Sequence, residues 1–166
     1  ELLPDGFTRE EAKLFAKRLE EIGVSYLSIT AGTVESRFDG EGMWSIRSPI
    51  GPSLPIAAEI KKEVKIPIIA NGQINDPIMM GEILREGKAD LIALARPLFS
   101  DPDLPNKVIQ GQPEEVRKCT HCCQCLWYLV KEWPVTCFQN PEMGKELEYN
   151  ISVSYTHLTL PTKRIV

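Results

Sequence analysis

The sequence alternates helix-forming segments with short, almost wholly apolar strands, and this alternation constrains the fold more than any other feature. The predicted helices cover residues 9–22, 55–64 and 77–86, and the predicted strands cover residues 24–30, 66–70 and 90–95. Strands that are apolar on both faces are typical of parallel sheets covered by helices. The sequence therefore predicts an α/β fold with a parallel sheet, in which three strands are too few to close a barrel.

Residues at the ends of these segments support the predicted boundaries. Thr8 and Glu11 form a capping box, and Gly23 stands where the first helix ends. Ser53 or its neighbours can cap the second helix, and Asp76 starts the third. The first helix also carries an apolar stripe that we expect to be buried, namely Ala12, Phe15, Ala16, Leu19 and Ile22.

Composition and charge exclude several classes of protein. Of the 166 residues, 43% are hydrophobic and 25% are charged, as in a globular protein with a core. The net charge of −4 does not suggest the basic face of a nucleic-acid-binding protein. No apolar run is long enough to span a bilayer. We therefore expect a cytoplasmic protein with neither a nucleic-acid nor a membrane partner.

A long connection follows the first predicted strand, between Gly32 and Ser53. Connections from strand to helix usually have only a few residues, and a long one at the carboxyl end of a parallel strand is commonly functional. This connection contains Arg37, Trp44 and Arg47. We interpret it as a functional loop, with a disordered insertion as the alternative.

All five cysteines of the chain lie in one short segment. Four of them share a C-x2-C-x2-C pattern with a later fourth member: Cys119, Cys122, Cys125 and Cys137. The two-residue spacings let thiolates from one tight turn converge on a single centre, which a more distant cysteine completes. Cys123 is then the spare. The spacing alone fits an iron–sulfur cluster and also a structural zinc site, in which His121 would be able to replace one sulfur.

Two predicted loops follow successive buried strands and fit a phosphate site. Asn71, Gly72 and Gln73 come directly after the second strand, and Ala95 and Arg96 come after the third. Loops in these places hold phosphates in (β/α) barrels, because glycine lets the backbone approach the phosphate and arginine binds it bidentately. The alternative is ordinary turn chemistry with a solvated arginine.

Together the motifs resemble the end of the old yellow enzyme barrel, at residues 66–73, 74–77, 87–92, 95–98 and 101–102. The cysteine segment with Asn140 and Pro141 narrows the resemblance to the iron–sulfur branch of that family. That branch contains 2,4-dienoyl-CoA reductase, 2-enoate reductase and trimethylamine dehydrogenase. The resemblance covers residues 4–146 and favours an iron–sulfur cluster over zinc.

The resemblance implies a partial (β/α)8 TIM barrel, of which this chain holds the last three strands, with a C-terminal Cys-rich segment. The residues that match the family's FMN site are Asn71, Gly72, Gln73, Ala95 and Arg96. The residues that match its 4Fe-4S ligands are Cys119, Cys122, Cys125 and Cys137. In the family the proton donor lies on earlier strands, so we assign no catalytic residue here.

The implied activity of the parent enzyme is transfer of electrons from NAD(P)H, through cluster and flavin, to an enoyl- or dienoyl-type C=C bond of a small-molecule substrate. We expect FAD and NAD(P)H to bind to a downstream part of the parent protein that is missing here. Two other functions fit parts of the sequence: a zinc-stabilised binding module, and a fragment of a phosphate-binding barrel without flavin.

The same reasoning predicts three segments. We expect residues 1–112 to be the end of the FMN-binding barrel, residues 113–146 to be the cluster segment and residues 147–166 to be a tail. Residues 151–166 break the family pattern abruptly and resemble a translated sequencing adaptor, so we expect them to lie outside the fold. We also expect this fragment alone to be inactive, because three strands leave the barrel core open.

Overall fold

The structure is a computed structural model that describes residues 6–32 and 50–148. It divides into two compact units, Glu1–Cys123 and Gln124–Val166. The expected functional loop with Arg37, Trp44 and Arg47 lies outside the described residues, and so does the tail from residue 151. The three predicted segments stay a prediction.

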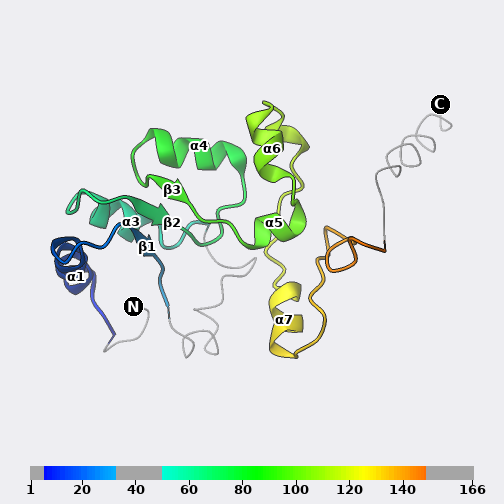
Figure 1. The fold of residues 1–166 in the computed structure, drawn as a ribbon, viewed down its shortest axis with the longest axis horizontal. Helices are drawn as coiled ribbons and strands as arrows, with labels where there is room; N and C mark the ends of the chain where they lie inside the picture. The colour runs from blue at the N-terminus through cyan, green and yellow to red at the C-terminus, as the bar shows by residue number, and fades with distance from the viewer. Residues whose placement is uncertain (1–5, 33–49, 149–166) are drawn as a thin grey trace. The chain divides into compact units, whose positions relative to one another are not determined.

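The first unit is built on a parallel sheet of three strands, β1 (Leu27–Ile29), β2 (Ile68–Ala70) and β3 (Leu91–Ile92), in the order β1-β2-β3 (Figure 1). Leu27 pairs with Ile68 on one side of β2, and Ile69 pairs with Leu91 on the other. The predicted α/β fold with a parallel sheet is therefore confirmed.

The strands are shorter than the apolar runs that predicted them, because neighbouring backbone groups bond to side chains. The amides of Lys65 and Ile66 both donate to the carboxylate of Glu20, at 2.6 and 3.0 Å. The amide of Ile68 donates to Asp90 Oδ2 at 2.9 Å. An apolar run therefore marks the position of a strand but not the length of its hydrogen-bonded ladder.

Helix α1 (Arg9–Glu21) begins at the predicted capping box. The amide of Glu11 donates to Thr8 Oγ1 at 3.3 Å, and the amide of Thr8 donates to the Glu11 carboxylate at 2.8 Å. Gly23 follows the helix with φ of +88°, a left-handed conformation that glycine adopts without strain. The predicted start and end of this helix are confirmed.

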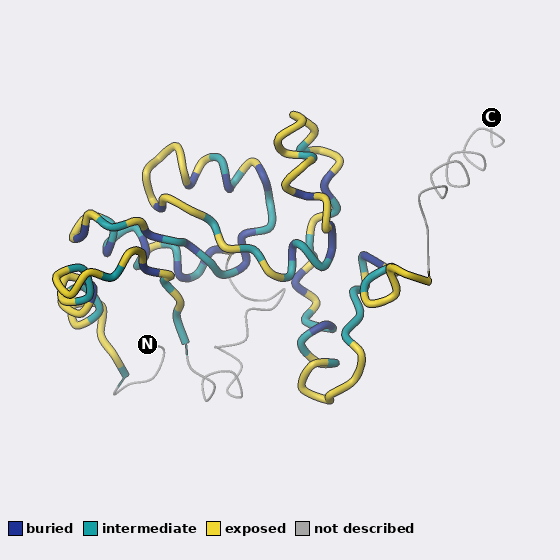
Figure 2. The backbone as a smooth tube through the Cα atoms, in the orientation of Figure 1, coloured by how far each residue is buried: buried dark blue, intermediate teal, exposed yellow. Residues whose placement is uncertain are grey.

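The apolar stripe of α1 is buried only in part. Ala16 is 3% exposed, and Ala12 and Leu19 pack beside it against the core. Phe15 is 54% exposed and Ile22 is 64% exposed, so the prediction is wrong for these two. Within the described residues α1 packs against α3, and a helix that packs against one neighbour buries a narrower stripe than its sequence offers. Figure 2 shows that much of α1 is exposed.

Helices α3 (Leu54–Lys61) and α4 (Pro77–Arg85) follow the long connection and β2 respectively. Asp76 caps α4 as predicted, because its side chain accepts from the amide of Ile78 at 3.0 Å. Ser53 occupies the N-cap position of α3, but its side chain makes no capping hydrogen bond. Ser53 therefore stands at the predicted start of the helix, but its hydroxyl donates to the carbonyl of Asn71 in a neighbouring loop instead of capping the helix.

The core of the first unit lies between the sheet and these helices. Ile68 and Ala70 of β2 are fully buried, as is Ala57 of α3, and Ile83 of α4 is 2% exposed. Burial of a large aliphatic side chain contributes about 1.5–3 kcal/mol to folding. The central strand therefore anchors the unit, and the loop that leaves its carboxyl end starts from a fixed point.

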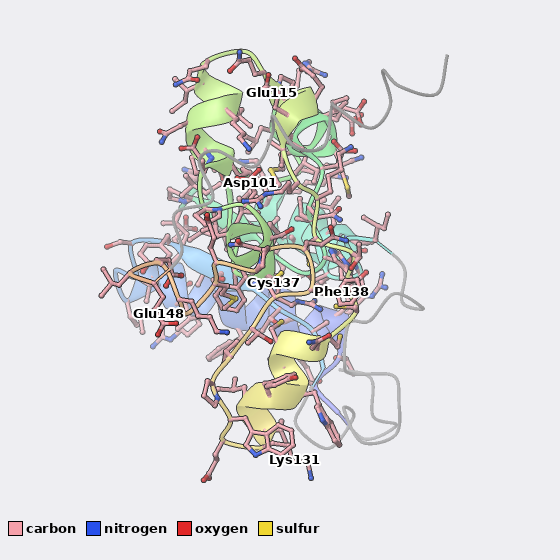
Figure 3. All side chains as sticks on the ribbon, turned by 90° about the vertical axis from the view of Figure 1, so that its right-hand side faces the viewer. Asp101, Glu115, Lys131, Cys137, Phe138 and Glu148 are labelled. Carbon is pink, nitrogen blue, oxygen red and sulfur yellow. The ribbon has the colours of Figure 1, made fainter. Side chains whose placement is uncertain are left out.

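Beyond β3 the chain forms α5 (Arg96–Ser100), α6 (Leu104–Ile109) and a 3-10 turn, η1 (Pro113–Glu115). Asp101, which is labelled in Figure 3, is 1% exposed and joins these elements. Its Oδ2 accepts from Lys107 Nζ at 2.7 Å and from the amide of Arg117 at 2.8 Å. This buried ion pair fixes the segment that leads into the cysteines.

The second unit contains α7 (Gln124–Val130), which was not predicted. Tyr128 and Trp133 meet edge to face with ring centroids 5.7 Å apart, and Lys131 lies 4.9 Å from the Trp127 ring centroid. Asn140 is 2% exposed, and its side-chain oxygen accepts from the amide of Glu142 at 3.2 Å. Across both units, every helix that the structure describes is too short or too polar to cross a bilayer.

Candidate functional site

The candidate site lies at the carboxyl ends of the parallel strands. β2 ends at Ala70 and is followed by Asn71, Gly72 and Gln73, and β3 leads through residues 93–95 to Arg96. The strands run parallel, and the amide of Ala93 donates to the carbonyl of Ala70 at 2.8 Å. The structure therefore brings both predicted phosphate loops to one edge of the sheet, where α/β proteins bind ligands.

The loop after β2 is held by two serines from other parts of the chain. The hydroxyl of Ser53 donates to the carbonyl of Asn71 at 2.5 Å. The Asn71 side-chain amide donates at 3.3 Å to the hydroxyl of Ser28, which lies in β1, the strand that pairs with β2. The backbone of this loop is thus tied both to β1 and to the start of α3.

Gly72 is required here for conformation and for space. Its φ is +92°, and a Cβ at this position would lie 2.9 Å from the Ser53 hydroxyl. Gln73 follows with φ of +52° and is 6% exposed. The sequence suggested that glycine at position 72 lets a phosphate approach the backbone closely. The structure adds a second reason, because any side chain at this position would collide with the Ser53 hydroxyl.

The loop after β3 passes directly into α5. Ala95 is exposed at the N-cap, and Arg96 is the first residue of the helix and is half-buried. Arg96 Nη1 donates to the sulfur of Cys123 at 3.4 Å. The guanidinium that sequence assigns to phosphate binding therefore lies against the cysteine segment.

The cysteine segment is also tied to the loop after β2. Asn75 Nδ2 donates to the carbonyl of Cys119 at 2.5 Å, and Lys118 Nζ forms an ion pair with Asp76 Oδ2 at 2.6 Å. The bond with Lys118 is the largest influence on the Asp76 carboxyl and lowers its pKa. Sequence reasoning missed Asn75 and Lys118 as site residues. Asn75 and Cys119 are separated by 44 residues along the chain, and Asp76 and Lys118 by 42, and no local pattern relates positions so far apart.

Residues 119–123 form an irregular loop with two left-handed residues, His121 at φ +56° and Cys123 at φ +61°. The amide of His121 donates to the sulfur of Cys119 at 3.4 Å. Burial lowers the pKa of His121, and the nearby Arg96 charge lowers it further. Burial also raises the pKa of the Cys123 thiol, an effect that Arg96 opposes.

The four cysteines that the spacing assigns to a cluster lie in different local structures of the two units. Cys119 and Cys122 lie in the irregular loop, and Cys125 is buried in α7. Cys137, which is labelled in Figure 3, is half-buried. Within the two described ranges no three His, Cys, Asp or Glu side chains gather as a metal-binding group. None of the five cysteines forms a disulfide. The assignment of four cysteines to a cluster, and of the five loop residues to a flavin, stays a prediction.

Comparison with known proteins gives a consistent result. The model of the NADH:flavin oxidoreductase / NADH oxidase family matches residues 6–115. A metal reductase of Desulforamulus reducens is 38% identical over 153 residues, which are 92% of this chain and 22% of that protein. A cinnamate reductase of Clostridium sporogenes is 34% identical over 140 residues, which are 82% of this chain and 20% of that protein.

A solved structure extends the similarity to the fold. The complex of 2-naphthoyl-CoA reductase with 2-naphthoyl-CoA superposes with a TM-score of 0.81 at 32% sequence identity. The superposition covers 89% of this chain and 22% of that one. The chain thus spans about a fifth of the length of the curated relatives it matches.

Proposed function

Because the chain belongs to the NADH:flavin oxidoreductase / NADH oxidase family, we propose that it is part of an oxidoreductase that uses FMN and a 4Fe-4S cluster. In this proposal the whole enzyme takes electrons from NAD(P)H and reduces an activated C=C bond. The observation that carries it is the meeting of both predicted phosphate loops with the cysteine segment at one edge of the sheet.

The three strands are the last three of a (β/α)8 barrel in this proposal. Their parallel order and the helices between them support it, as does the similarity to the 2-naphthoyl-CoA reductase structure. The carboxyl edge of such a barrel is the usual place for a flavin phosphate, which loops after the last strands bind.

The residues that would hold FMN are Asn71, Gly72, Gln73, Ala95 and Arg96. The left-handed turn at Gly72 and Gln73, with Asn71 held by two serines, is a rigid backbone of the kind that binds phosphate. Arg96 adds a positive charge with several donors. When bound, FMN accepts a hydride or single electrons and so connects NAD(P)H, the cluster and the C=C substrate.

The residues that would hold the cluster are Cys119, Cys122, Cys125 and Cys137. Thiolates are the usual ligands of 4Fe-4S clusters, and backbone N–H groups directed at sulfur stabilise their charge. The His121 amide makes such a bond to Cys119. Cys123 is left out of the set, because its sulfur is engaged by Arg96 and by the carbonyl of His121.

The names of two relatives support an unsaturated substrate. Cinnamate and 2-naphthoyl-CoA both carry C=C bonds conjugated to a carbonyl group, and reductases act on both. We propose an enoyl- or dienoyl-type substrate for the enzyme that contains this chain. A conjugated carbonyl polarises the C=C bond and makes it a good hydride acceptor, which suits a flavin donor.

Analysis of cofactors in the full-length protein tests the proposal. We expect one FMN per chain from the barrel, four irons and four sulfides from the cluster, and oxidation of NAD(P)H that depends on an enoate such as cinnamate. A colourless protein that holds one zinc and no flavin would overturn the proposal and favour the zinc-stabilised binding module. Phosphate binding without flavin would favour the third function.

A further inference from the structure

Cys123 is the cysteine that the proposed cluster does not use, and its sulfur lies between two polar groups. Arg96 Nη1 donates to Cys123 Sγ at 3.4 Å, and Cys123 Sγ donates to the carbonyl of His121 at 3.5 Å. The thiol therefore accepts one hydrogen bond and donates another, which uses both of its capacities. The three groups form a short chain from the guanidinium to the loop backbone.

This contact joins two elements that are far apart in the sequence. Arg96 opens α5 directly after β3, and Cys123 lies 27 residues later in the irregular loop. Cys123 and His121 both have φ near +60°, a conformation that costs a non-glycine residue of order 1 kcal/mol. Two of the three residues 121–123 carry this conformational cost. In this conformation the sulfur of Cys123 lies within hydrogen-bonding distance of Arg96.

The cysteine segment is also tied to residues that follow β2. Asn75 holds the carbonyl of Cys119, and Asp76 holds Lys118. Asn75 and Asp76 both belong to the loop after β2. That loop also contains Asn71, Gly72 and Gln73, the part of the proposed phosphate site that lies apart from Ala95 and Arg96. The loop that bears Cys123 is therefore anchored on one phosphate loop and contacts the arginine of the other.

We propose that Cys123 is a positioning residue for Arg96, and that it holds the guanidinium in place for the phosphate group of a flavin mononucleotide. The inference rests on the proposed function. An arginine side chain has many rotamers, so an arginine without a neighbour that fixes its conformation loses side-chain entropy when it binds phosphate. A neighbour that fixes it beforehand removes part of that cost and raises the affinity for the phosphorylated ligand alone.

Binding of FMN and of riboflavin to the flavin-free full-length protein tests this inference, because riboflavin lacks the phosphate. We expect Cys123→Ala to weaken FMN binding about fivefold, the effect of one ordinary hydrogen bond, and to leave riboflavin binding unchanged. Cys123→Ser keeps a donor and an acceptor and should lose less. Thr120→Ala, at an exposed position of the same loop, is the matched control and should bind FMN normally.

The double variant separates positioning from a general structural role. In the Arg96→Ala background, Cys123→Ala should cause no further loss of FMN affinity, because the group that it positions is gone. Iron and sulfide contents should stay at the wild-type level in Cys123→Ala.

Three results would overturn the inference. An unchanged affinity of Cys123→Ala for FMN, with Arg96→Ala weakened, would reject the role of Cys123 and keep the proposed function. Loss of iron in Cys123→Ala would show that Cys123 is a ligand. A wild-type protein that binds riboflavin and FMN equally would reject both the inference and the flavin-phosphate site.

Discussion

The two compact units differ in what holds them together. In the first unit, apolar side chains from the sheet and from α3 and α4 form a core, with Ile68 and Ala57 fully buried. In the described part of the second unit, the buried side chains are Cys125 and Asn140, while Trp127 and Phe138 are 57% and 74% exposed. A segment with so little buried apolar surface does not repay the entropy of its own ordering.

This difference suggests two sources of stability in one chain. The hydrophobic effect suffices for the first unit, whereas small segments with few buried apolar residues commonly depend on a bound metal or on disulfides. The second unit carries two of the four proposed cluster ligands and no disulfide. We therefore expect its order to depend on the proposed cluster, and the predictions below test this contrast.

The largest expected effect follows from removal of a ligand. Single Cys→Ser substitutions at Cys119, Cys122 or Cys125 should abolish iron binding, because a 4Fe-4S cluster needs all four thiolates. Iron and sulfide analysis of the full-length protein checks this. Hydrogen exchange should become fast in α7 and stay slow in β2.

The spare cysteine provides the control for that experiment. Cys123→Ser should retain the cluster. Loss of iron in Cys123→Ser, with Cys122→Ser unaffected, would show that the wrong member of this pair has been chosen.

A pair of truncations compares the two units directly. Ile68→Ala removes most of a fully buried side chain and should lower the free energy of unfolding by about 2–5 kcal/mol. Phe138→Ala removes a side chain that is 74% exposed and should change it by less than about 0.5 kcal/mol. Urea denaturation measures both. Equal effects would contradict the contrast between the units.

The buried ion pair of Asp101 with Lys107 predicts a pH dependence in the first unit. Burial, the largest influence, raises the pKa of Asp101, but its hydrogen bonds to Lys107 and to backbone amides outweigh burial and hold the pKa below 3.8. The ion pair therefore stabilises the fold fully above pH 4–5, and this stabilisation is lost as the pH falls below 3.8 toward the folded-state value.

Asp101→Asn removes that charge and leaves Lys107 without its acidic partner. We expect the free energy of unfolding to fall by about 2 kcal/mol at pH 7. This is a smaller loss than complete truncation of the side chain would cause, because asparagine keeps a hydrogen-bonding group. Urea denaturation at pH 7 and at pH 3 checks it. The difference in free energy of unfolding between wild type and variant should be smaller at pH 3. An equal difference at both pH values would contradict the stabilising role of the ion pair.

The smallest expected effect concerns the capping box of α1. Thr8→Ala removes the side-chain acceptor of the Glu11 amide and should cost about 1 kcal/mol. Thermal unfolding of the variant measures this cost. Thr8→Ser keeps the hydroxyl and should restore most of the stability, whereas equal losses in both variants would argue against a capping role.

Much of the first unit was predictable from local patterns. The capping box of Thr8, the cap of Asp76 and the glycine at position 23 act over a few residues, so their sequence signals are sufficient. Ser53 shows where local reasoning stops. Its hydroxyl has two possible partners, the amides of α3 and the carbonyl of Asn71, and only the packing of the loop after β2 selects the second.

The conformation of the cysteine segment was not predictable from the spacing of its cysteines. The spacing of the cysteines suggested one tight turn, whereas the structure has two left-handed residues followed by α7. A left-handed φ at His121 and Cys123 is disfavoured by the residues themselves, so no propensity would predict it. It is imposed by contacts of the loop with distant groups, among them Arg96 and Asn75.

The sequence by itself determined the α/β class, the order of the three strands and the helices between them, and the family, because helical and strand periods, caps and motifs are read over short stretches. Only the tertiary structure decided which side chains meet at the edge of the sheet. Asn75 with Cys119, Asp76 with Lys118 and Arg96 with Cys123 are pairs 27 to 44 residues apart. Hydrogen bonds form within about 3.5 Å, and only the folded backbone brings such distant positions within that reach.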